Sequence, residues 1–188
     1  MADLITLQEY KNYMGINGPT QDTEIGATIP KVSQLVKNYC RRTFVDYVDE
    51  DKVERFSGGE FFLLSEFPVT QIVDVETSDD YGKTYSSMVE YETWAFDHEH
   101  ETVVPIETDY FAKKVNGYRV TYRGGYEVVP EDLKLAVLDL VTYYMKHEAA
   151  IHNTSILSGN SAQVQYITNP NFPTNIKRVL DLYVGNYN

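Results

Sequence analysis

A change in hydrophobic period along the chain constrains its fold more strongly than any other feature of the sequence. Residues 22–42 carry apolar side chains at the spacing of one helical face, whereas residues 43–128 follow the two-residue alternation of β-strands. The helical spacing returns after residue 128. Helices at both ends with strands between them predict an α+β fold rather than an alternating α/β fold. The first helical face consists of Ile25, Ile29, Val32, Val36 and Tyr39.

Local signals predict where the helices begin. Thr6 and Glu9 have the spacing of a capping box at the start of the first helix. Pro30 lies inside the second helix, where we expect a kink or a late start. Pro130 suits the first position of the third helix. The predicted helices are 7–14, Asp22 or Thr23 to 42, 130–147, and a short helix that Thr174 caps.

The middle of the chain predicts several short antiparallel strands joined by turns. Two glycines at 57–60 are typical of a hairpin turn, and the polar run at 78–85 predicts another turn. Both segments separate stretches that alternate apolar and polar residues. The expected strands lie at 44–48, 52–58, 60–65, 70–78, 93–104 and 110–126.

These elements are expected to form one domain over residues 1–188. Residues 1–42 and 129–188 supply the helical core, a small bundle of about four helices, into which 43–128 is inserted as an antiparallel β-sheet block. Residues 151–173 are polar and without period, so they are predicted to be a loop. Because chain termini and polar loops of this length are usually disordered unless something holds them, we hypothesise that a neighbouring chain holds this loop or the C-terminal segment.

The acidic composition argues against a surface that binds nucleic acid through its phosphates. The chain has 28 Asp and Glu against 16 Lys and Arg, a net charge of −12. The single Cys40 excludes an intrachain disulfide and a multi-cysteine zinc site, and we expect it to be a small buried residue. No stretch approaches the roughly 18 apolar residues of a membrane span. The first residues do not resemble a signal peptide, so we expect folding in a reducing cytoplasm.

Tyrosine is unusually abundant, with 16 residues. One explanation is the preference of tyrosine for half-buried positions on a sheet. The other is contact between subunits, in which a tyrosine offers apolar area and a polar tip. The sequence leaves both explanations open.

The glycine pair Gly124-Gly125 lies between a predicted strand and a helix, where a phosphate-binding loop or a catalytic elbow could occur. A P-loop requires Lys followed by Ser or Thr after its last glycine, and a nucleophile elbow requires G-x-S-x-G. Neither pattern is present, and Glu127 would repel phosphate. Glycines tolerate a positive φ, and the residue before Pro130 favours an extended backbone. We therefore predict a corner between a sheet and a helical layer rather than a binding site.

An acidic stretch with two histidines is the strongest candidate for a metal site. His98 and His100 would share one face of a strand and could bind a metal together with a carboxylate. No third ligand on that face is evident, and alternating charge also suits an exposed edge strand. A small metal- or ligand-binding protein that uses this strand is the alternative function, but we predict no metal, no cofactor and no catalytic residue.

Two clusters of basic residues could contact phosphate. The alternative, which we favour because the chain is acidic, is that they are solvated or paired with carboxylates. One cluster comprises Lys31, Lys37, Arg41 and Arg42, and the other comprises Lys113, Lys114, Arg119 and Arg123.

Three stretches together resemble the head–tail connector (adaptor) proteins of tailed bacteriophages. The first is a short helix followed by a long one that ends in Tyr-Cys-x-Arg-x-Phe, at residues 39–44. The second, at 57–75, has paired apolar residues, then Pro-Val, then Ile-x-x-Val. The third, at 118–145, joins a strand and Gly-Tyr to Val-Pro-x-Asp-Leu-x-x-Ala and a helix. The three stretches occur in the order expected for this family.

The resemblance implies a structural virion protein without enzymatic activity. Such proteins assemble in the host cytoplasm as a homo-oligomeric ring, commonly of twelve copies, beneath the portal protein. The ring extends the channel through which genomic DNA passes without specific binding, and it docks a tail or neck protein. A net negative charge suits a channel that must not hold DNA. We predict interface positions in the C-terminal part of the chain, at Phe172, Ile176, Tyr183 and Tyr187.

Overall fold

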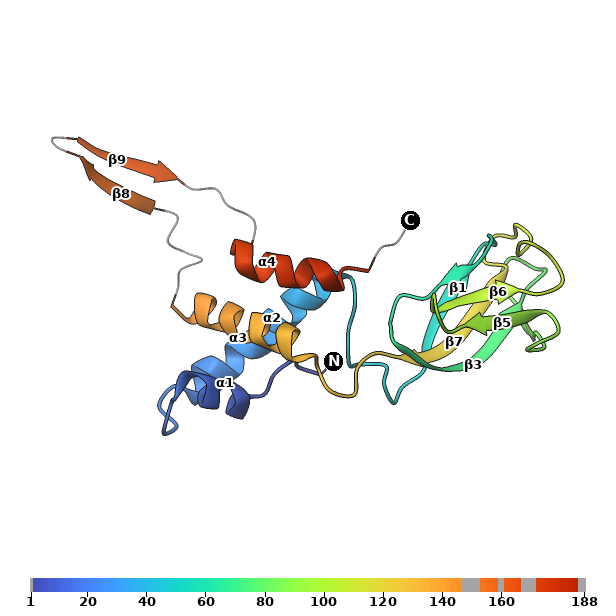
Figure 1. Cartoon of the computed structure of the whole chain (residues 1–188), viewed down its shortest axis with the longest axis horizontal. Helices are drawn as coiled ribbons and strands as arrows, with labels where there is room; N and C mark the ends of the chain where they lie inside the picture. Colours follow the sequence, from blue (N-terminus) through green and yellow to red (C-terminus); the bar gives the residue numbers. More distant parts are fainter. Residues whose placement is uncertain (1, 147–152, 159–160, 167–171, 186–188) are drawn as a thin grey trace. The chain divides into compact units, whose positions relative to one another are not determined.

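The chain forms two compact units, one helical and one built from β-strands (Figure 1). The computed structural model describes residues 2–146, 153–158, 161–166 and 172–185, with 153–158 and 161–166 described by their backbone alone. The helical unit consists of residues from 3–40 and 129–184, and the β unit consists mainly of residues 41–128. The predicted α+β class is confirmed.

The helical unit contains the predicted helices, with small changes at their starts. The capping box of the first helix is confirmed: the Glu9 N–H donates to Thr6 Oγ1 over 3.2 Å, and the Thr6 N–H donates to Glu9 Oε2 over 2.7 Å. The second helix begins at Asp22 and includes Pro30, so a late start was the wrong expectation. The helices are α1 (Leu7–Met14), α2 (Asp22–Cys40), α3 (Glu131–Met145) and α4 (Thr174–Leu180), followed by the 3-10 turn η2 (Asp181–Tyr183).

A proline is the N-cap of each of the last two helices, which differs from both predictions for these helix starts. Pro130 is the N-cap of α3, and the first helical residue is Glu131, one residue later than predicted. The Pro130 carbonyl accepts the Lys134 N–H over 2.8 Å. Pro173 is the N-cap of α4, and Thr174 is therefore the first helical residue instead of a side-chain cap. Since proline fixes its own φ and lacks an N–H, it suits a helix start, where that N–H would have no intrahelical partner.

Apolar faces of α2, α3 and α4 form the core of the helical unit. The face predicted for α2 is buried from Ile25 to Val36, and Cys40 is fully buried, as expected. Burial of each such aliphatic side chain contributes about 1.5–3 kcal/mol. Other core residues include Leu133, Val137, Leu140 and Val141 from α3, and Ile176 and Leu180 from α4.

The β unit consists of two antiparallel sheets. The four-stranded sheet has the order β1-β7-β3-β4, and the three-stranded sheet has the order β2-β6-β5. Tyr118, Val120 and Tyr122 of β7 point into the core and alternate with Arg119 and Thr121. The strands are β1 (Lys52–Phe56), β2 (Phe62–Leu63), β3 (Val69–Thr77), β4 (Ser86–Ser87), β5 (Trp94–Asp97), β6 (Thr102–Pro105) and β7 (Tyr118–Gly124).

Several predicted strands differ from those observed. Residues 44–48 form bends and turns instead of a strand, and Phe44 has a φ of 68°. The segment 93–104 is two strands with a turn between them, and only 118–124 of the segment 110–126 is a strand. The glycine turn at 57–60 joins strands of different sheets, because β1 pairs with β7 and β2 pairs with β6. Alternation alone does not indicate which strands are neighbours.

Stacked aromatic rings fill the core of the β unit. The ring of Phe62 lies 4.6 Å from that of Phe56 and 4.0 Å from that of Phe111, with 16° between the planes in both pairs. Tyr118 packs against this column at a tilt. Such pairs add about 0.5–1.5 kcal/mol beyond their burial. Part of the tyrosine content therefore belongs to the core, while Tyr81, Tyr91 and Tyr110 are largely exposed.

A β-hairpin lies within the segment that we predicted to be a loop. Strands β8 (Asn153–Ser158) and β9 (Ser161–Tyr166) pair antiparallel, with Asn153 opposite Tyr166 and Ser158 opposite Ser161. The prediction of a loop over 151–173 is thus wrong for these twelve paired residues. The remaining positions up to residue 171 lie outside the described residues.

The backbone turns a tight corner at Gly124-Gly125 within the β unit. A Cβ at Gly124 would lie 2.9 Å from the Glu66 carbonyl oxygen, and a Cβ at Gly125 would lie 2.3 Å from that of Phe44. Gly125 also has a φ of 114°, which L side chains rarely adopt. Its N–H donates to the Pro68 carbonyl over 2.9 Å. These glycines permit a close approach between backbone segments, which agrees with the predicted structural corner.

We predict that Gly125→Ala lowers the free energy of unfolding by at least about 2 kcal/mol, because it adds backbone strain and a clash with the Phe44 carbonyl. The matched control is Gly26→Ala in α2, where an added Cβ meets no atom within 4 Å. This control is expected to stabilise the chain by about 0.4–1 kcal/mol. Urea denaturation measures both variants, with the fluorescence of Trp94 reporting on the β unit and circular dichroism reporting on the helical unit. Equal stability of Gly125→Ala and the wild type would contradict this account of the corner.

Candidate functional site

Three chain segments of the β unit meet at one place, which we call the junction. It comprises residues 42–47, where the chain enters the unit, the loop 65–68, and residues 122–126, where the chain leaves. Main-chain hydrogen bonds join them: Gly124 N–H donates to Tyr47 over 3.1 Å, and Tyr126 N–H donates to Phe44 over 2.6 Å. The glycine corner is part of this junction.

A buried arginine and a buried glutamate hold the junction together. Arg42 is 2% exposed and Glu66 is 1% exposed. The guanidinium carbon of Arg42 lies 3.3 Å from the centre of the Phe67 ring, which is a close cation–π contact, and Arg42 also donates to the Phe67 carbonyl. The Glu66 carboxylate lies 4.0 Å from Arg42 Nε, and it accepts the Thr43 and Phe44 N–H groups over 2.7 and 3.2 Å. The charges are therefore compensated where solvent cannot reach.

Tyr122 extends this polar network into the sheet. Its hydroxyl accepts the Glu66 N–H over 3.0 Å and donates to Glu54. Burial, followed by the negative charge of Glu54, raises the pKa of Tyr122 well above its ordinary value, so the hydroxyl stays protonated and remains a donor. All its partners belong to the β unit. The network has the properties of a structural core rather than of a catalytic centre.

Both basic clusters contain residues that are paired with carboxylates, which is one of the two alternatives that we expected. In the second cluster the expected ion pairs are present: Arg119 pairs with Glu76, Arg123 with Asp51, and Lys114 with Asp79. In the first cluster, Arg42 pairs with Glu66 as described, although both are buried, and Lys37 is 3% exposed, so neither of these two basic residues is solvated. The burial of Arg42 could not be predicted from local sequence, because its guanidinium packs on Phe67, which is distant in the chain.

The two histidines of the acidic stretch lie in a turn and not on one strand face. Residues 98–101 connect β5 to β6. His100 Nδ1 lies 2.8 Å from Asp97 Oδ2, a hydrogen bond that lowers the pKa of Asp97, while the His98 ring packs edge-on to Phe96. Within the described part of the chain, no group of three or more His, Cys, Asp or Glu residues is placed to hold a metal ion. The premise of the metal alternative, a shared strand face, is therefore wrong.

Asp80 organises the polar turn at 78–84. Its carboxylate accepts the Lys83 and Thr84 N–H groups over 2.9 and 2.8 Å, and the Thr84 hydroxyl over 2.6 Å. Donation from the Thr84 hydroxyl, then from the Thr84 N–H, lowers the pKa of Asp80 to about 2. The predicted turn is confirmed, and its carboxylate is used for turn structure.

The C-terminal positions that we predicted as interface anchors have different environments. Phe172 is half-buried, with its ring edge-on to Tyr39 at 4.9 Å, and the Tyr183 hydroxyl donates to Asp132 over 2.6 Å. Ile176 is only 4% exposed within the helical unit, so our expectation that it is an exposed anchor was wrong. Tyr187 lies outside the described residues. Leu182 of η2, which we did not predict, is 75% exposed and is the better candidate here.

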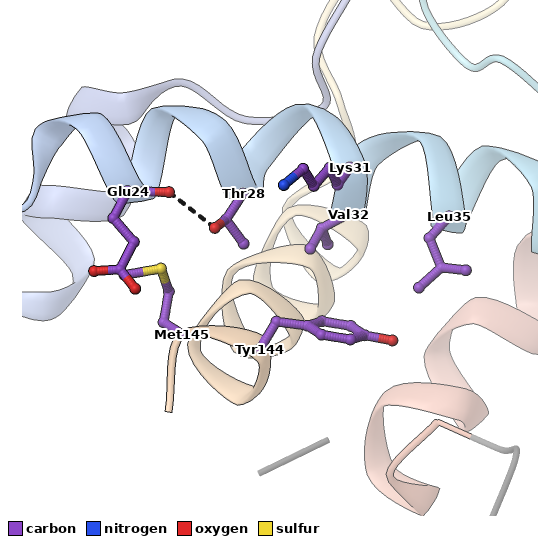
Figure 2. Close-up of a pocket in the computed structure, with 7 residues that line it drawn as sticks. All are labelled: Glu24, Thr28, Lys31, Val32, Leu35, Tyr144 and Met145. Atoms are coloured by element: carbon purple, nitrogen blue, oxygen red, sulfur yellow. Dashed lines mark hydrogen bonds between the residues drawn. The ribbon is translucent and has the colours of Figure 1, made fainter. Parts of the chain in front are cut away.

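An open groove lies in the helical unit between α2 and the end of α3 (Figure 2). It has a volume of about 370 Å³. Figure 2 shows Val32, Leu35 and Tyr144 along its apolar part, with Glu24 beside Met145 at the other end. Burial raises the pKa of Tyr144. Its polar lining residues are Glu24, Thr28 and Lys31, and the Thr28 hydroxyl donates to the Glu24 carbonyl over 2.8 Å.

No helix in the described segments is both long enough and apolar enough to cross a membrane.

Comparison with known families identifies the class of protein. The model of the head completion protein family matches residues 3–184. The chain therefore belongs to the head completion protein family, and its place is the virion. This confirms the resemblance to the connectors between phage heads and tails. No curated protein matches the chain.

Solved structures with the same fold come from gene transfer agent (GTA) particles. The neck of an empty GTA particle, computed with C6 symmetry, has a chain with a TM-score of 0.58 and 11% identity, covering 98% of this chain and 91% of that one. A chain from the virion of a native GTA particle has a TM-score of 0.59 and 10% identity, covering 98% of this chain and 91% of that one. A chain from the neck of a native GTA particle, computed with C12 symmetry, has a TM-score of 0.56 and 10% identity, covering 99% of this chain and 95% of that one. At these identities the likeness shows a common fold over nearly the whole of both chains.

We predict that Glu66→Ala destabilises the β unit by about 3 kcal/mol, because it leaves the buried Arg42 without a carboxylate and two N–H groups without an acceptor. The matched control is Glu60→Ala, since Glu60 is exposed. It is expected to change stability by no more than about 0.5 kcal/mol. Urea denaturation measures both variants. If Glu66→Ala unfolds at the same urea concentration as the control, the junction is not held by this charge pair.

We predict that the Asp80 carboxyl titrates near pH 2, below its ordinary value of 3.8. Because the folded-state pKa is lowered, the turn is fully stabilised above the ordinary pKa, and this stabilisation is lost as the pH falls through about 2. Carboxyl ¹³C NMR follows the titration. Thr84→Val, which removes the hydroxyl donor, should raise the midpoint, whereas Thr108→Val in a different turn should leave it unchanged. A wild-type midpoint near 3.8 would contradict the prediction.

Proposed function

We propose that this protein is a structural head completion protein that forms a ring in the neck of a tailed particle. The ring lies beneath the portal protein, extends the channel for genomic DNA, and docks the next tail or neck protein. The observation that carries this proposal is the family match over residues 3–184, which includes both units. The structures of similar fold support it, since two of them are necks computed with C6 and C12 symmetry.

The distribution of charge supports a role in which DNA passes the protein without being bound by it. The β unit contains 19 of the 28 acidic residues but only 9 of the 16 basic ones. At least five of those basic residues are paired with carboxylates, namely Arg42, Lys52, Lys114, Arg119 and Arg123. Around a ring of identical subunits, the same excess of negative charge is repeated in every copy. A negative surface repels the phosphates of a duplex. DNA can then pass the ring without binding to it.

Exposed apolar side chains on the β unit support contact with another protein. Phe61 and Leu63 alternate with the buried Phe62 and Leu64, so they lie on the opposite face of the strand and are 50% and 40% exposed. Ile106, which follows β6 in the same sheet, is 46% exposed. Grouped apolar residues on a surface are typical of protein–protein contact. We propose this face as a docking surface for a neck or tail protein.

The proposed role requires no catalysis and no cofactor. The carboxylates of Asp80 and Glu66 accept hydrogen bonds within a turn and within the core of the β unit, respectively. The contribution of each copy is shape, charge and contact area. Function then depends on assembly.

The test compares particle production in two kinds of cells. One lacks the gene for this protein, and in the other the wild-type gene has been restored. We predict that without it, heads and tails accumulate separately, because the joining subunit is missing, and that restoration returns complete particles. Electron microscopy counts the particles, and protein analysis of purified particles detects the chain. Complete tailed particles without this protein, or complete particles in which the restored chain is absent, would contradict the proposed role.

A further inference from the structure

A long uncharged segment surrounds the β8–β9 hairpin. Between Glu148 and Lys177 the sequence contains no Asp, Glu, Lys or Arg, although these residues make up 23% of the whole chain. The hairpin occupies the middle of this segment. Natural edge strands usually carry charges, lysine especially, which prevent pairing with other chains. Both strands of this hairpin lack that protection.

The hairpin also has two open edges. It forms a two-stranded sheet, and no third strand pairs with it in the described part of the chain. A two-stranded hairpin is only marginally stable in water, and three or more strands are the usual minimum for a stable sheet. Its outer N–H and C=O groups can pair with a further strand.

The register identifies the backbone groups that face outward. Ser158 lies opposite Ser161 across a two-residue connection, so these two are the first and last residues of the turn and form a hydrogen-bonded pair. Hydrogen-bonded and non-hydrogen-bonded pairs alternate along an antiparallel ladder. The pairs Ser155–Val164 and Leu157–Ala162 are therefore non-hydrogen-bonded. Their N–H and C=O groups point to the outer edges.

We propose that the β8–β9 hairpins of neighbouring copies pair edge to edge and close into one continuous antiparallel sheet around the ring. This inference rests on the proposed ring. Rotational symmetry places the outer edge of β9 in one copy beside the outer edge of β8 in the next, and each junction between copies then gains about six main-chain hydrogen bonds. Closure leaves no open edge, which explains how an uncharged hairpin avoids uncontrolled aggregation.

A second copy of this chain fits the edges better than an unrelated strand does. Strand order continues as β8, β9, β8, β9, so every neighbour is antiparallel, as within the hairpin itself. Lack of charge lets many identical hairpins stand side by side without repulsion. For about twelve copies, strands about 4.8 Å apart give a closed sheet of roughly 24 strands, about 115 Å in circumference and about 37 Å across. Barrels of 16–18 strands already enclose an aqueous channel.

The experiment compares the full-length wild type with Val164→Pro and its matched control Val164→Ala. Proline removes one outward N–H, whereas alanine keeps it and only shortens the side chain. Native mass spectrometry measures the ring, and residue-resolved hydrogen exchange measures the hairpin amides. We expect wild type and Val164→Ala to form rings and Val164→Pro to form at least tenfold fewer. Circular dichroism with thermal unfolding establishes that Val164→Pro keeps the helical unit folded, and Ser155→Pro with Ser155→Ala repeats the comparison on the other edge.

Hydrogen exchange separates edge pairing from other ways of holding the hairpin. In the ring, we expect the outward amides of Ser155, Leu157, Ala162 and Val164 to exchange at least tenfold more slowly than in the dissociated subunit. Rings in which these amides exchange as in the subunit would overturn the proposal, as would normal rings of Val164→Pro. A wild type that stays monomeric at high concentration, or amides protected only after another neck protein is added, would also overturn it.

The outcomes also separate this inference from the proposed function. If the chain is absent from complete particles, the neck role fails whatever the hairpin does. If the chain is present in the neck, but its outward hairpin amides exchange freely there, only the edge pairing fails.

Discussion

The β unit depends on a crossing of backbone segments that leaves no room for side chains. At the junction the entering and leaving segments lie so close that Gly124 and Gly125 cannot carry a Cβ, while Arg42 and Glu66 neutralise each other out of reach of solvent. The chain enters and leaves the β unit at the same corner. A whole two-sheet unit can therefore be inserted in the sequence between the helical segments 3–40 and 129–184. Gly124 and Gly125, whose position between a strand and a helix raised the question of a phosphate-binding loop, permit this close approach of the entering and leaving segments.

Sequence predicted the features that local chemistry determines. The apolar spacing of α2 and the capping box at Thr6 need no information from distant residues, and both were confirmed. Strand neighbours and the burial of Arg42 and Ile176 depend on tertiary packing, and these were predicted wrongly or missed. The β8–β9 hairpin was missed because its residues are polar. The signal available was Gly159-Asn160, a dipeptide typical of two-residue hairpin turns, at the centre of a stretch without charges.

Charge is distributed along this chain in a way that suits a connector. The β unit contains most of the excess acidic residues, whereas the segment between Glu148 and Lys177 contains no formal charge. In a symmetric assembly every local charge is repeated in each copy, so a small excess becomes a strong field and a charge at a shared edge becomes repulsion. Acidic residues are therefore useful where DNA must not bind. They are unfavourable where identical copies must touch.

A hairpin that is marginal by itself suits a protein that functions only after assembly. In one copy, the ordering of β8 and β9 costs conformational entropy, and the few hydrogen bonds between the two strands offset little of that cost. In a closed ring, each added copy satisfies two edges at once, and the last copy removes the only edges that remain. In the proposed ring, ordering of the hairpin and closure of the ring would be one cooperative event, because an incomplete ring always retains two unpaired edges. Edge pairing would in this way favour complete rings over partial ones, although no single junction between copies needs to be strong.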